Sequence, residues 1–279
     1  MSSLWINGTF HSDDTARIDP FDHGLTTGDG VFEATELVDG VPFATTRHLR
    51  RLHRSAAALG LRVPYDDDTL AAAMAEVGAS VTQNAGGNAK IRLTMTGGAG
   101  PLGSGRGDSV ATVIIAAAGG TAPWPQNEAV LVVAWVRNER GATAGVKTTS
   151  YAENVIALQR AHEAGAGEAI FANSVGNLCE GTGTNVFLVH DGTLITPPLT
   201  SGCLAGVTRE LLMEVIDVEE RDVPIGALSA CSEAFLTSST RRVHPIRSVD
   251  GVDLQGCPGP ATAAASTAFA QLMSQTLDP

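Results

Sequence analysis

Three short motifs between residues 145 and 209 decide the fold: GVKTTSY over residues 145–151, LCEGTGTNVF over residues 178–187 and GCLAGVTR over residues 202–209. The first contains Lys147, whose primary amine can form an imine with an aldehyde, which a guanidinium cannot usefully do. The second places Glu180 at a predicted junction between a loop and a strand. The third predicts a helix that opens at Gly206–Thr208, where backbone N–H groups and a hydroxyl form an anion site.

A lysine, a carboxylate and an anion site at a helix start are the parts that a pyridoxal-phosphate site needs. The lysine forms the imine, the carboxylate keeps the pyridine nitrogen protonated, and the helix start holds the phosphate. The chain has two lysines, Lys90 and Lys147, against sixteen arginines. This bias is typical of a genome that favours Arg codons, and a lysine retained in it points to chemistry that requires an amine.

Composition and charge exclude several classes of protein. Hydrophobic residues make up 43% of the chain and charged residues 17%, which is typical of a globular protein. The net charge of −12 argues against nucleic acid as the main partner. The four cysteines include no CxxC pair, so we expect neither a metal site nor a redox motif.

The sequence gives no sign of export or of membrane insertion. The first residues lack a basic flank and a long apolar run, so no signal peptide is indicated. The longest apolar run, near residues 110–118, is too short to span a bilayer. We therefore expect no membrane contact and a cytoplasmic location.

One domain boundary is visible in the Gly- and Pro-rich segment AAAGGTAPWPQNE, residues 116–128. It predicts a small N-terminal domain over 1–118, an interdomain linker over 119–128 and a large cofactor-binding domain over 129–279. Apolar runs and helical patterns mix without a strict βαβ rhythm, which favours a mixed α+β (α/β) fold. Strands are predicted at 4–6, 31–38, 91–96, 110–116, 129–136, 168–172, 185–190 and 193–196. Helices are predicted at 46–59, 68–82, 153–164, 208–216 and 261–274.

The helix predicted at 46–59 is strongly two-sided. Thr45 or Thr46 is the expected N-terminal cap, and Gly60 is the expected stop. Its apolar face carries Leu49, Leu52, Ala56 and Leu59, and its opposite face carries Arg47, Arg50, Arg51 and Arg54. This basic face either binds an anion or is simply solvated.

Other catalytic motifs are weak or missing. The stretch TGGAGPLGSGR at residues 96–106 lacks the GK[ST] ending of a P-loop, so we interpret it as a mobile loop between strands. No HExxH motif is present, and no GxSxG turn supports a Ser/His/Asp triad.

The order and spacing of several motifs resemble the class IV aminotransferases, also called fold type IV, over nearly the whole chain. These motifs are WING at 5–8, GDGVFE at 28–33, HLRRL at 48–52, Lys147, EGTGTN at 180–185, AGVTR at 205–209 and LTSS at 236–239. The family includes branched-chain aminotransferases, D-amino acid aminotransferases, (R)-selective amine transaminases and 4-amino-4-deoxychorismate lyases. The resemblance implies a smaller N-terminal α/β domain, a larger barrel-like C-terminal domain, and a homodimer.

The resemblance also implies roles for individual residues. Lys147 binds pyridoxal 5'-phosphate as a Schiff base and moves a proton at the substrate α-carbon, so its pKa must fall, as burial beside a cationic cofactor would cause. Glu180 pairs with the pyridine nitrogen. Arg51, Val207 (through its N–H), Thr208 and Ser239 hold the phosphate. Branched-chain aminotransferases carry a tyrosine five residues after the lysine, whereas Tyr151 is four residues after Lys147, so its contact with the cofactor is left open.

The substrate is expected to contact a further set of residues: Phe32, Glu33, Arg92, the loop at 96–106, Arg241 and Arg242. An arginine in this set can grip a substrate carboxylate with two hydrogen bonds, or it can pair with a carboxylate of the protein. Glu33 follows the aminotransferase pattern, where lyases often carry Thr, and Arg92 matches an arginine of the branched-chain group.

These features favour a ping-pong aminotransferase acting on a small amino acid or amine with a 2-oxo acid acceptor. The GDGVFE segment resembles the D-amino acid branch, so D-amino acids or (R)-amines are the favoured donors. The alternatives are a 4-amino-4-deoxychorismate lyase, which would release pyruvate and 4-aminobenzoate, and a branched-chain L-amino acid aminotransferase. A binding protein that merely keeps the fold is disfavoured because Lys147, Glu180 and Arg51 are all present.

Overall fold

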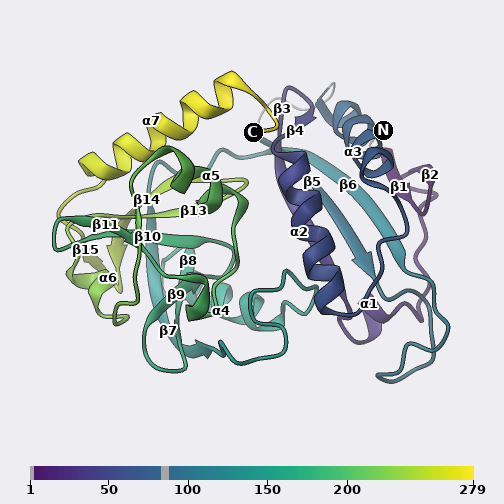
Figure 1. The fold of residues 1–279 in the computed structure, drawn as a ribbon, viewed down its shortest axis with the longest axis horizontal. Helices are drawn as coiled ribbons and strands as arrows, with labels where there is room; N and C mark the ends of the chain where they lie inside the picture. Colours follow the sequence, from purple (N-terminus) through teal and green to yellow (C-terminus); the bar gives the residue numbers. More distant parts are fainter. Residues whose placement is uncertain (1–2, 83–87) are drawn as a thin grey trace. The chain divides into compact units, whose positions relative to one another are not determined.

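The computed structural model describes residues 3–82 and 88–279. The chain forms two compact units, which Figure 1 draws as ribbons. The first unit comprises the chain up to Pro123 together with Val146–Tyr151 and Asp278, and the remaining residues form the second unit. The segment around Lys147 therefore belongs to the first unit, although the second unit surrounds it in sequence.

Within the described residues, an antiparallel six-stranded sheet forms the centre of the first unit. Its strands, in order across the sheet, are β2 (Thr9–Ser12), β1 (Ser3–Ile6), β6 (Thr112–Thr121), β5 (Asn88–Thr96), β3 (Gly30–Val38) and β4 (Val41–Pro42). Strand β6 is longer than the 110–116 predicted, because it pairs along β5 as far as Asn88 opposite Thr121. The backbone ladder thus continues through small residues that give no β-branched signal.

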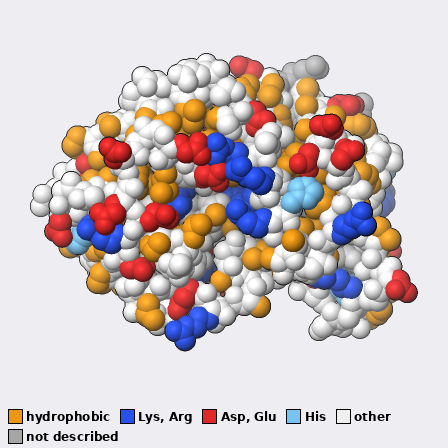
Figure 2. Space-filling model, in the orientation of Figure 1, with side chains coloured by type: hydrophobic (Ala, Val, Ile, Leu, Met, Phe, Trp, Pro, Cys, Tyr) orange, Lys and Arg blue, Asp and Glu red, His pale blue; other side chains and the backbone are white. Residues whose placement is uncertain are grey.

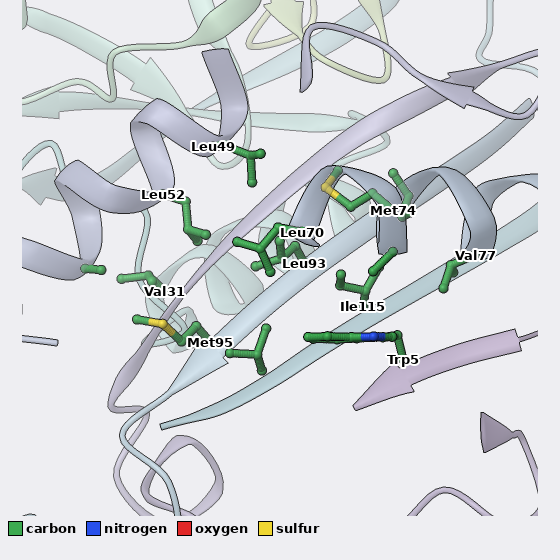
Figure 3. Packing of buried hydrophobic residues seen from close by; sticks show 14 of the residues in the cluster. Trp5, Val31, Leu49, Leu52, Leu70, Met74, Val77, Leu93, Met95 and Ile115 are labelled. Atoms are coloured by element: carbon green, nitrogen blue, oxygen red, sulfur yellow. The ribbon is translucent and has the colours of Figure 1, made fainter. Parts of the chain in front are cut away.

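Two helices cover one face of this sheet. They are α2 (Thr45–Ala58) and α3 (Asp67–Thr82), and a short helix, α1 (His23–Thr26), precedes β3. Figure 3 shows side chains of both helices packed over the sheet; the labelled residues are Leu49, Leu52, Leu70, Met74, Val77, Trp5, Val31, Leu93, Met95 and Ile115. Full burial of each aliphatic side chain of this size contributes roughly 1.5–3 kcal/mol. Because side chains alternate along a strand, Phe32, Arg92 and Thr94 lie on the opposite face.

The start of α2 differs from the prediction. The helix begins at Thr45 after Ala44, which has a left-handed backbone (φ 55°) and makes no side-chain cap. The backbone N–H and the hydroxyl of Thr46 donate to the Asp278 carboxylate, at 2.9 and 2.6 Å. The predicted threonine cap is therefore wrong, because a carboxylate distant in sequence satisfies this N–H group.

The second unit contains a mixed nine-stranded sheet in the described part of the chain. In order, its strands are β12 (Glu219–Glu220), β11 (Thr193–Thr196), β10 (Asn185–His190), β13 (Ala234–Ser238), β14 (Arg242–Val249), β7 (Glu128–Arg137), β8 (Glu168–Asn173) and β9 (Leu178–Gly181), with β15 (Val252–Asp253) beside β14. The β14–β7, β7–β8 and β11–β12 pairs are parallel, and the others are antiparallel.

The predicted hairpin in this unit is confirmed. Strands β10 and β11 have the predicted bounds, and Asp191 and Gly192 between them both have positive φ, 52° and 78°. Two such residues in succession give the tight turn that suits a twisted hairpin. The helices of the unit are α4 (Ala152–Glu163), α5 (Val207–Val215), α6 (Ala227–Ala230) and α7 (Pro260–Gln275).

The chain thus has the mixed α/β architecture that its sequence predicts. The predicted domain limits at 118 and 129 stay a prediction. No helix within residues 3–82 and 88–279 is long and apolar enough to cross a membrane. On the face drawn in Figure 2, acidic and basic side chains are interspersed with apolar ones.

Candidate active site

Backbone pairing with β3 places Lys147. The N–H of Phe32 donates to the carbonyl of Lys147 at 3.0 Å, and the N–H of Thr149 donates to the carbonyl of Gly30 at 2.8 Å. Thr148 forms an antiparallel bridge with Val31 between these two hydrogen bonds. The lysine is therefore held at the edge of the sheet by a short strand-like ladder.

Four predicted site residues meet around the Phe32 ring. The Lys147 Nζ lies 4.4 Å from the ring centre, and the Arg92 guanidinium carbon lies 3.5 Å from it. The Tyr151 ring meets the Phe32 ring edge-on, with 5.3 Å between the centres. Arg92 Nε also donates to the Thr94 hydroxyl at 3.0 Å. Burial lowers the pKa of Arg92, but an arginine remains charged at neutral pH.

Glu33 and Arg51 form a buried ion pair on the other face of β3. Arg51 Nε and Nη2 donate to the two oxygens of Glu33 at 2.8 and 2.6 Å, and His48 Nδ1 lies 2.7 Å from Glu33 Oε2. Glu33 is 1% exposed and Arg51 is 4% exposed. Two sequence interpretations therefore need correction: Arg51 does not share the outer face of α2, and Glu33 lies away from the face that carries Phe32 and Arg92.

Charge pairing controls the ionisation of this group. Burial alone would raise the pKa of Glu33, but the Arg51 guanidinium and the His48 hydrogen bond lower it to about 2. Burial lowers the pKa of His48, and Glu33 opposes that shift. His48 was not among the site residues predicted from the sequence. The i, i+3, i+7 spacing of His48, Arg51 and Ser55 was the available signal, because it places all three beside the apolar stripe of α2.

In the second unit, Glu180 lies on β9 and not at the start of a strand. Its Oε1 accepts a hydrogen bond from Arg137 Nε at 3.1 Å, and its Oε2 accepts one from the N–H of Leu204 at 2.9 Å. The Arg137 guanidinium lies 4.0 Å from the centre of the Phe171 ring. These contacts orient the carboxylate. Arg137 has no motif around it and was not predicted.

The predicted helix start is confirmed at α5, which begins at Val207 with Gly206 as its N-cap and no side-chain cap. A side chain at position 206 would collide with Asn185, because a Cβ there would lie 2.0 Å from Asn185 Oδ1. Asn185 is fixed in turn, since its Nδ2 donates to the carbonyl of Leu204 at 2.8 Å. Glycine at 206 thus leaves the first N–H groups of the helix without a side-chain cap, as an anion site requires.

Ser239 lies in the turn that joins β13 to β14. The strands pair from Ser238 opposite Arg242, so the turn is Ser239–Arg241. The predicted substrate residue Arg241 is largely enclosed by the unit, with Nη1 3.4 Å from Glu168 Oε2. Arg242 has a left-handed backbone, with φ 57°, and an exposed side chain. A contact of either arginine with substrate stays a prediction.

The loop predicted at 96–106 is anchored. Arg106 donates from Nε and Nη2 to the two oxygens of Asp29, each at 2.6 Å. His23 Nε2 lies 2.9 Å from the carbonyl oxygen of Pro101, and the Ser109 hydroxyl donates to the carbonyl of Gly97 at 2.7 Å. The glycine-rich sequence predicted a mobile loop, whereas these contacts restrain it.

The residues of each unit fit the parts of a pyridoxal-phosphate site. The first unit brings Lys147, Phe32, Arg92 and Tyr151 together. The second unit presents an oriented carboxylate at Glu180, an uncapped helix start at Val207–Thr208, and a hydroxyl at Ser239. The Lys147 amine suits an aldehyde, and the Glu180 carboxylate suits a pyridine nitrogen. The helix start and the Ser239 hydroxyl suit a phosphate.

The sequence of this chain is similar to those of known aminotransferases. The family model for amino-transferase class IV matches residues 30–249. A D-alanine aminotransferase of Listeria innocua is 30% identical, over 92% of this chain and 91% of that protein. A branched-chain-amino-acid aminotransferase of Escherichia coli K12 is 29% identical, over 95% of this chain and 91% of its own length.

Solved structures give the same answer. The branched-chain aminotransferase of Thermoproteus uzoniensis, crystallised with norvaline, has a TM-score of 0.88 and 29% identity, covering 97% of this chain and 94% of its own. The chain therefore belongs to the class IV aminotransferases, the fold type IV transaminases that depend on pyridoxal 5'-phosphate.

Proposed function

We propose that this enzyme transfers an amino group between a small D-amino acid or (R)-amine and a 2-oxo acid in two half-reactions, with Lys147 as the lysine that binds the cofactor covalently. The observation that carries the proposal is that Lys147 Nζ and the Arg92 guanidinium carbon both lie against the Phe32 ring, 4.4 and 3.5 Å from its centre. One aromatic side chain thus contacts both the amine and an arginine that can bind a carboxylate.

Lys147 acts as the base and acid at the substrate α-carbon. Bound pyridoxal phosphate supplies an electron-withdrawing ring that stabilises negative charge at that carbon. Glu180 would keep the pyridine nitrogen of this ring protonated, since Arg137 and the Leu204 N–H hold its carboxylate in a fixed orientation.

The phosphate would be held by groups at the start of α5 and in the turn that joins β13 to β14. The N–H groups at Val207 and Thr208, the Thr208 hydroxyl and the Ser239 hydroxyl are our candidates. Arg51 remains a candidate from the family pattern, and its ion pair with Glu33 would fix the guanidinium in one orientation.

Arg92 is our candidate for the substrate carboxylate, with the Phe32 ring beside the substrate side chain. The GDGVFE segment and the D-alanine aminotransferases among the relatives support D-amino acids. Arg92 and the branched-chain aminotransferases among the relatives support a second candidate, transamination of branched-chain L-amino acids.

The test of substrate class is a half-reaction without acceptor. The holoenzyme is mixed separately with D-alanine, (R)-1-phenylethylamine, L-leucine and aminodeoxychorismate. Loss of the yellow cofactor colour with D-alanine or the (R)-amine supports the proposal, and loss with L-leucine alone supports the branched-chain candidate. Release of pyruvate and 4-aminobenzoate from aminodeoxychorismate, with the colour retained, would overturn both and indicate a lyase.

The test of Lys147 uses the low lysine content of the chain. Borohydride reduction of the holoenzyme, followed by peptide mass spectrometry, should place the pyridoxyl group on Lys147 and leave Lys90 unlabelled. A label on Lys90 alone, or no label on a yellow protein, would contradict the assignment.

We also propose a homodimer, as in the family resemblance. Light scattering coupled to size-exclusion chromatography should give twice the chain mass of 28.7 kDa. A fully active species at the single-chain mass would contradict it.

A further inference from the structure

The turn that carries Ser239 is held by side chains from elsewhere in the second unit. Arg241 Nη1 lies 3.4 Å from Glu168 Oε2, with the two side chains 10% and 1% exposed. The Arg241 guanidinium lies 4.2 Å from the centre of a Trp124 ring, and Trp124 Nε1 donates to the carbonyl of Thr240 at 2.9 Å. Both the side chain and the backbone of the turn are therefore tied down.

The same carboxylate holds a second loop. Glu168 Oε1 accepts hydrogen bonds from the N–H of Thr182, at 3.0 Å, and from its hydroxyl, and Oε2 accepts one from the Thr184 hydroxyl at 3.3 Å. Asn185 then begins β10 opposite Thr237 of β13. The loop at 182–184 and the turn at 239–241 thus lie side by side at one end of this strand pair.

Glycine at 181 allows the loop at 182–184 to lie close to Glu168. A Cβ there would lie 2.2 Å from the Thr184 hydroxyl and 3.2 Å from the carboxyl carbon of Glu168. Burying a carboxylate is unfavourable unless donors and a cation compensate. A turn that merely joins two strands needs no such pair, so the arrangement points to a requirement for a fixed position.

We propose that Glu168 and Arg241, with Trp124, are positioning residues that set the Ser239 turn against the loop at 182–184 for binding of the cofactor phosphate. The proposal rests on the role given above to Ser239. It gives Arg241 an internal function in place of contact with substrate. Glu168 acts on the phosphate only through the two loops.

The test compares pyridoxal phosphate with pyridoxal, which lacks the phosphate. Equilibrium binding of each is measured by absorbance for the wild type, Arg241→Gln, Arg241→Lys and Trp124→Phe. Arg247→Gln is the matched control, because Arg247 lies on β14, the strand that follows the turn, in an exposed ion pair with Asp253. We expect Arg241→Gln to raise the Kd for pyridoxal phosphate between about 10-fold and 100-fold, as small misplacements of binding groups do, and to leave the Kd for pyridoxal unchanged.

The other variants separate the two ties on the turn. Arg241→Lys keeps the charge and should recover part of the loss, while Trp124→Phe keeps the ring but removes the hydrogen bond to Thr240 and should show a smaller loss. If Arg241→Gln does not fold, the comparison is made with these two variants. The control should bind like the wild type.

Three results would overturn the inference. One is an equal loss of affinity for pyridoxal and its phosphate, which indicates general damage. Another is unchanged affinity for both in Arg241→Gln and Trp124→Phe. The third is a raised KM for the amino donor at unchanged cofactor affinity, which returns Arg241 to the substrate. Failure of the proposed function shows separately, as a wild type that prefers pyridoxal phosphate to pyridoxal but does not transaminate.

Discussion

At the scale of single residues, replacement of Lys147 is the most direct prediction. Lys147→Ala should lower kcat by at least about 100-fold, because a positioned acid–base group contributes roughly 10²–10⁴-fold. Steady-state assays measure the loss, and circular dichroism should show an intact fold. Lys90→Arg is the control, since it changes the other lysine of the chain and should retain activity. Wild-type turnover in Lys147→Ala would exclude the assignment.

Glu33 gives a prediction about stability. Glu33→Gln leaves the buried Arg51 charge without its carboxylate, and breaking one side of a buried ion pair costs about 3–5 kcal/mol. Urea denaturation should show this loss in the free energy of unfolding. Glu36→Gln, on the same strand but only half-buried, should change it by much less. Equal effects in the two variants would mean that the ion pair has no special weight.

Some of these residue contacts could be predicted from the sequence and others could not. The chemical identity of Lys147 and Glu180 follows from what an imine and a pyridinium require. The partners of charged residues do not follow, because Glu33 and Arg51, or Glu168 and Arg241, are distant in sequence and no local pattern links them. Burial of Arg51 was open to inference from the helical spacing that it shares with His48.

At the scale of elements, the start of α5 gives a prediction. Gly206→Ala places a Cβ against Asn185, whose amide is already held by Leu204. Overpacking of this kind costs about 1–3 kcal/mol, and displacement of the helix start should also weaken binding of pyridoxal phosphate. Thermal unfolding and equilibrium binding measure the two effects. Gly226→Ala is the control, because a Cβ at that N-cap of α6 meets no heavy atom within 4 Å. Tight cofactor binding in Gly206→Ala would refute the role of this helix.

His244, on strand β14, should make the stability of the fold depend on pH. Burial, and then the Arg241 charge, lower the pKa of His244 to about 4, and the residue is 4% exposed. Between pH 6.5 and 4 the unfolded chain binds a proton here that the folded chain does not, so the free energy of unfolding falls as pH falls through this window. The contribution is about 3 kcal/mol. The difference in unfolding free energy between wild type and His244→Gln should shrink over this pH range, and a constant difference would contradict the shift.

Periodicity explains which elements were predictable. Long patterns gave α2, α3 and the β10–β11 hairpin within one or two residues. Strands β13 and β14 were missed, because Pro245 and the Arg241–Arg242 pair interrupt their apolar pattern. The two-residue strands β4, β12 and β15 are too short to carry a period at all.

At the scale of the whole molecule, composition and motif order predicted a mixed α/β enzyme with two parts. They could not predict that Val146–Tyr151 joins the first unit. That choice is made by backbone hydrogen bonds to β3, and backbone groups are the same in every sequence. The family pattern identifies the lysine, and the pairing explains how the chain holds it.

This pairing decides which changes the lysine segment can tolerate. Two main-chain hydrogen bonds, one on each side of the Thr148–Val31 bridge, fix the direction of the Lys147 side chain. That direction therefore depends on the number of residues in the segment. A side-chain exchange at Thr148 leaves that count intact. An insertion of one residue between Lys147 and Thr148 would turn the amine to the opposite side of the sheet, away from Phe32 and Arg92. Homologous enzymes should therefore vary in the residue at the position of Thr148 while keeping the spacing between the bridge and the lysine.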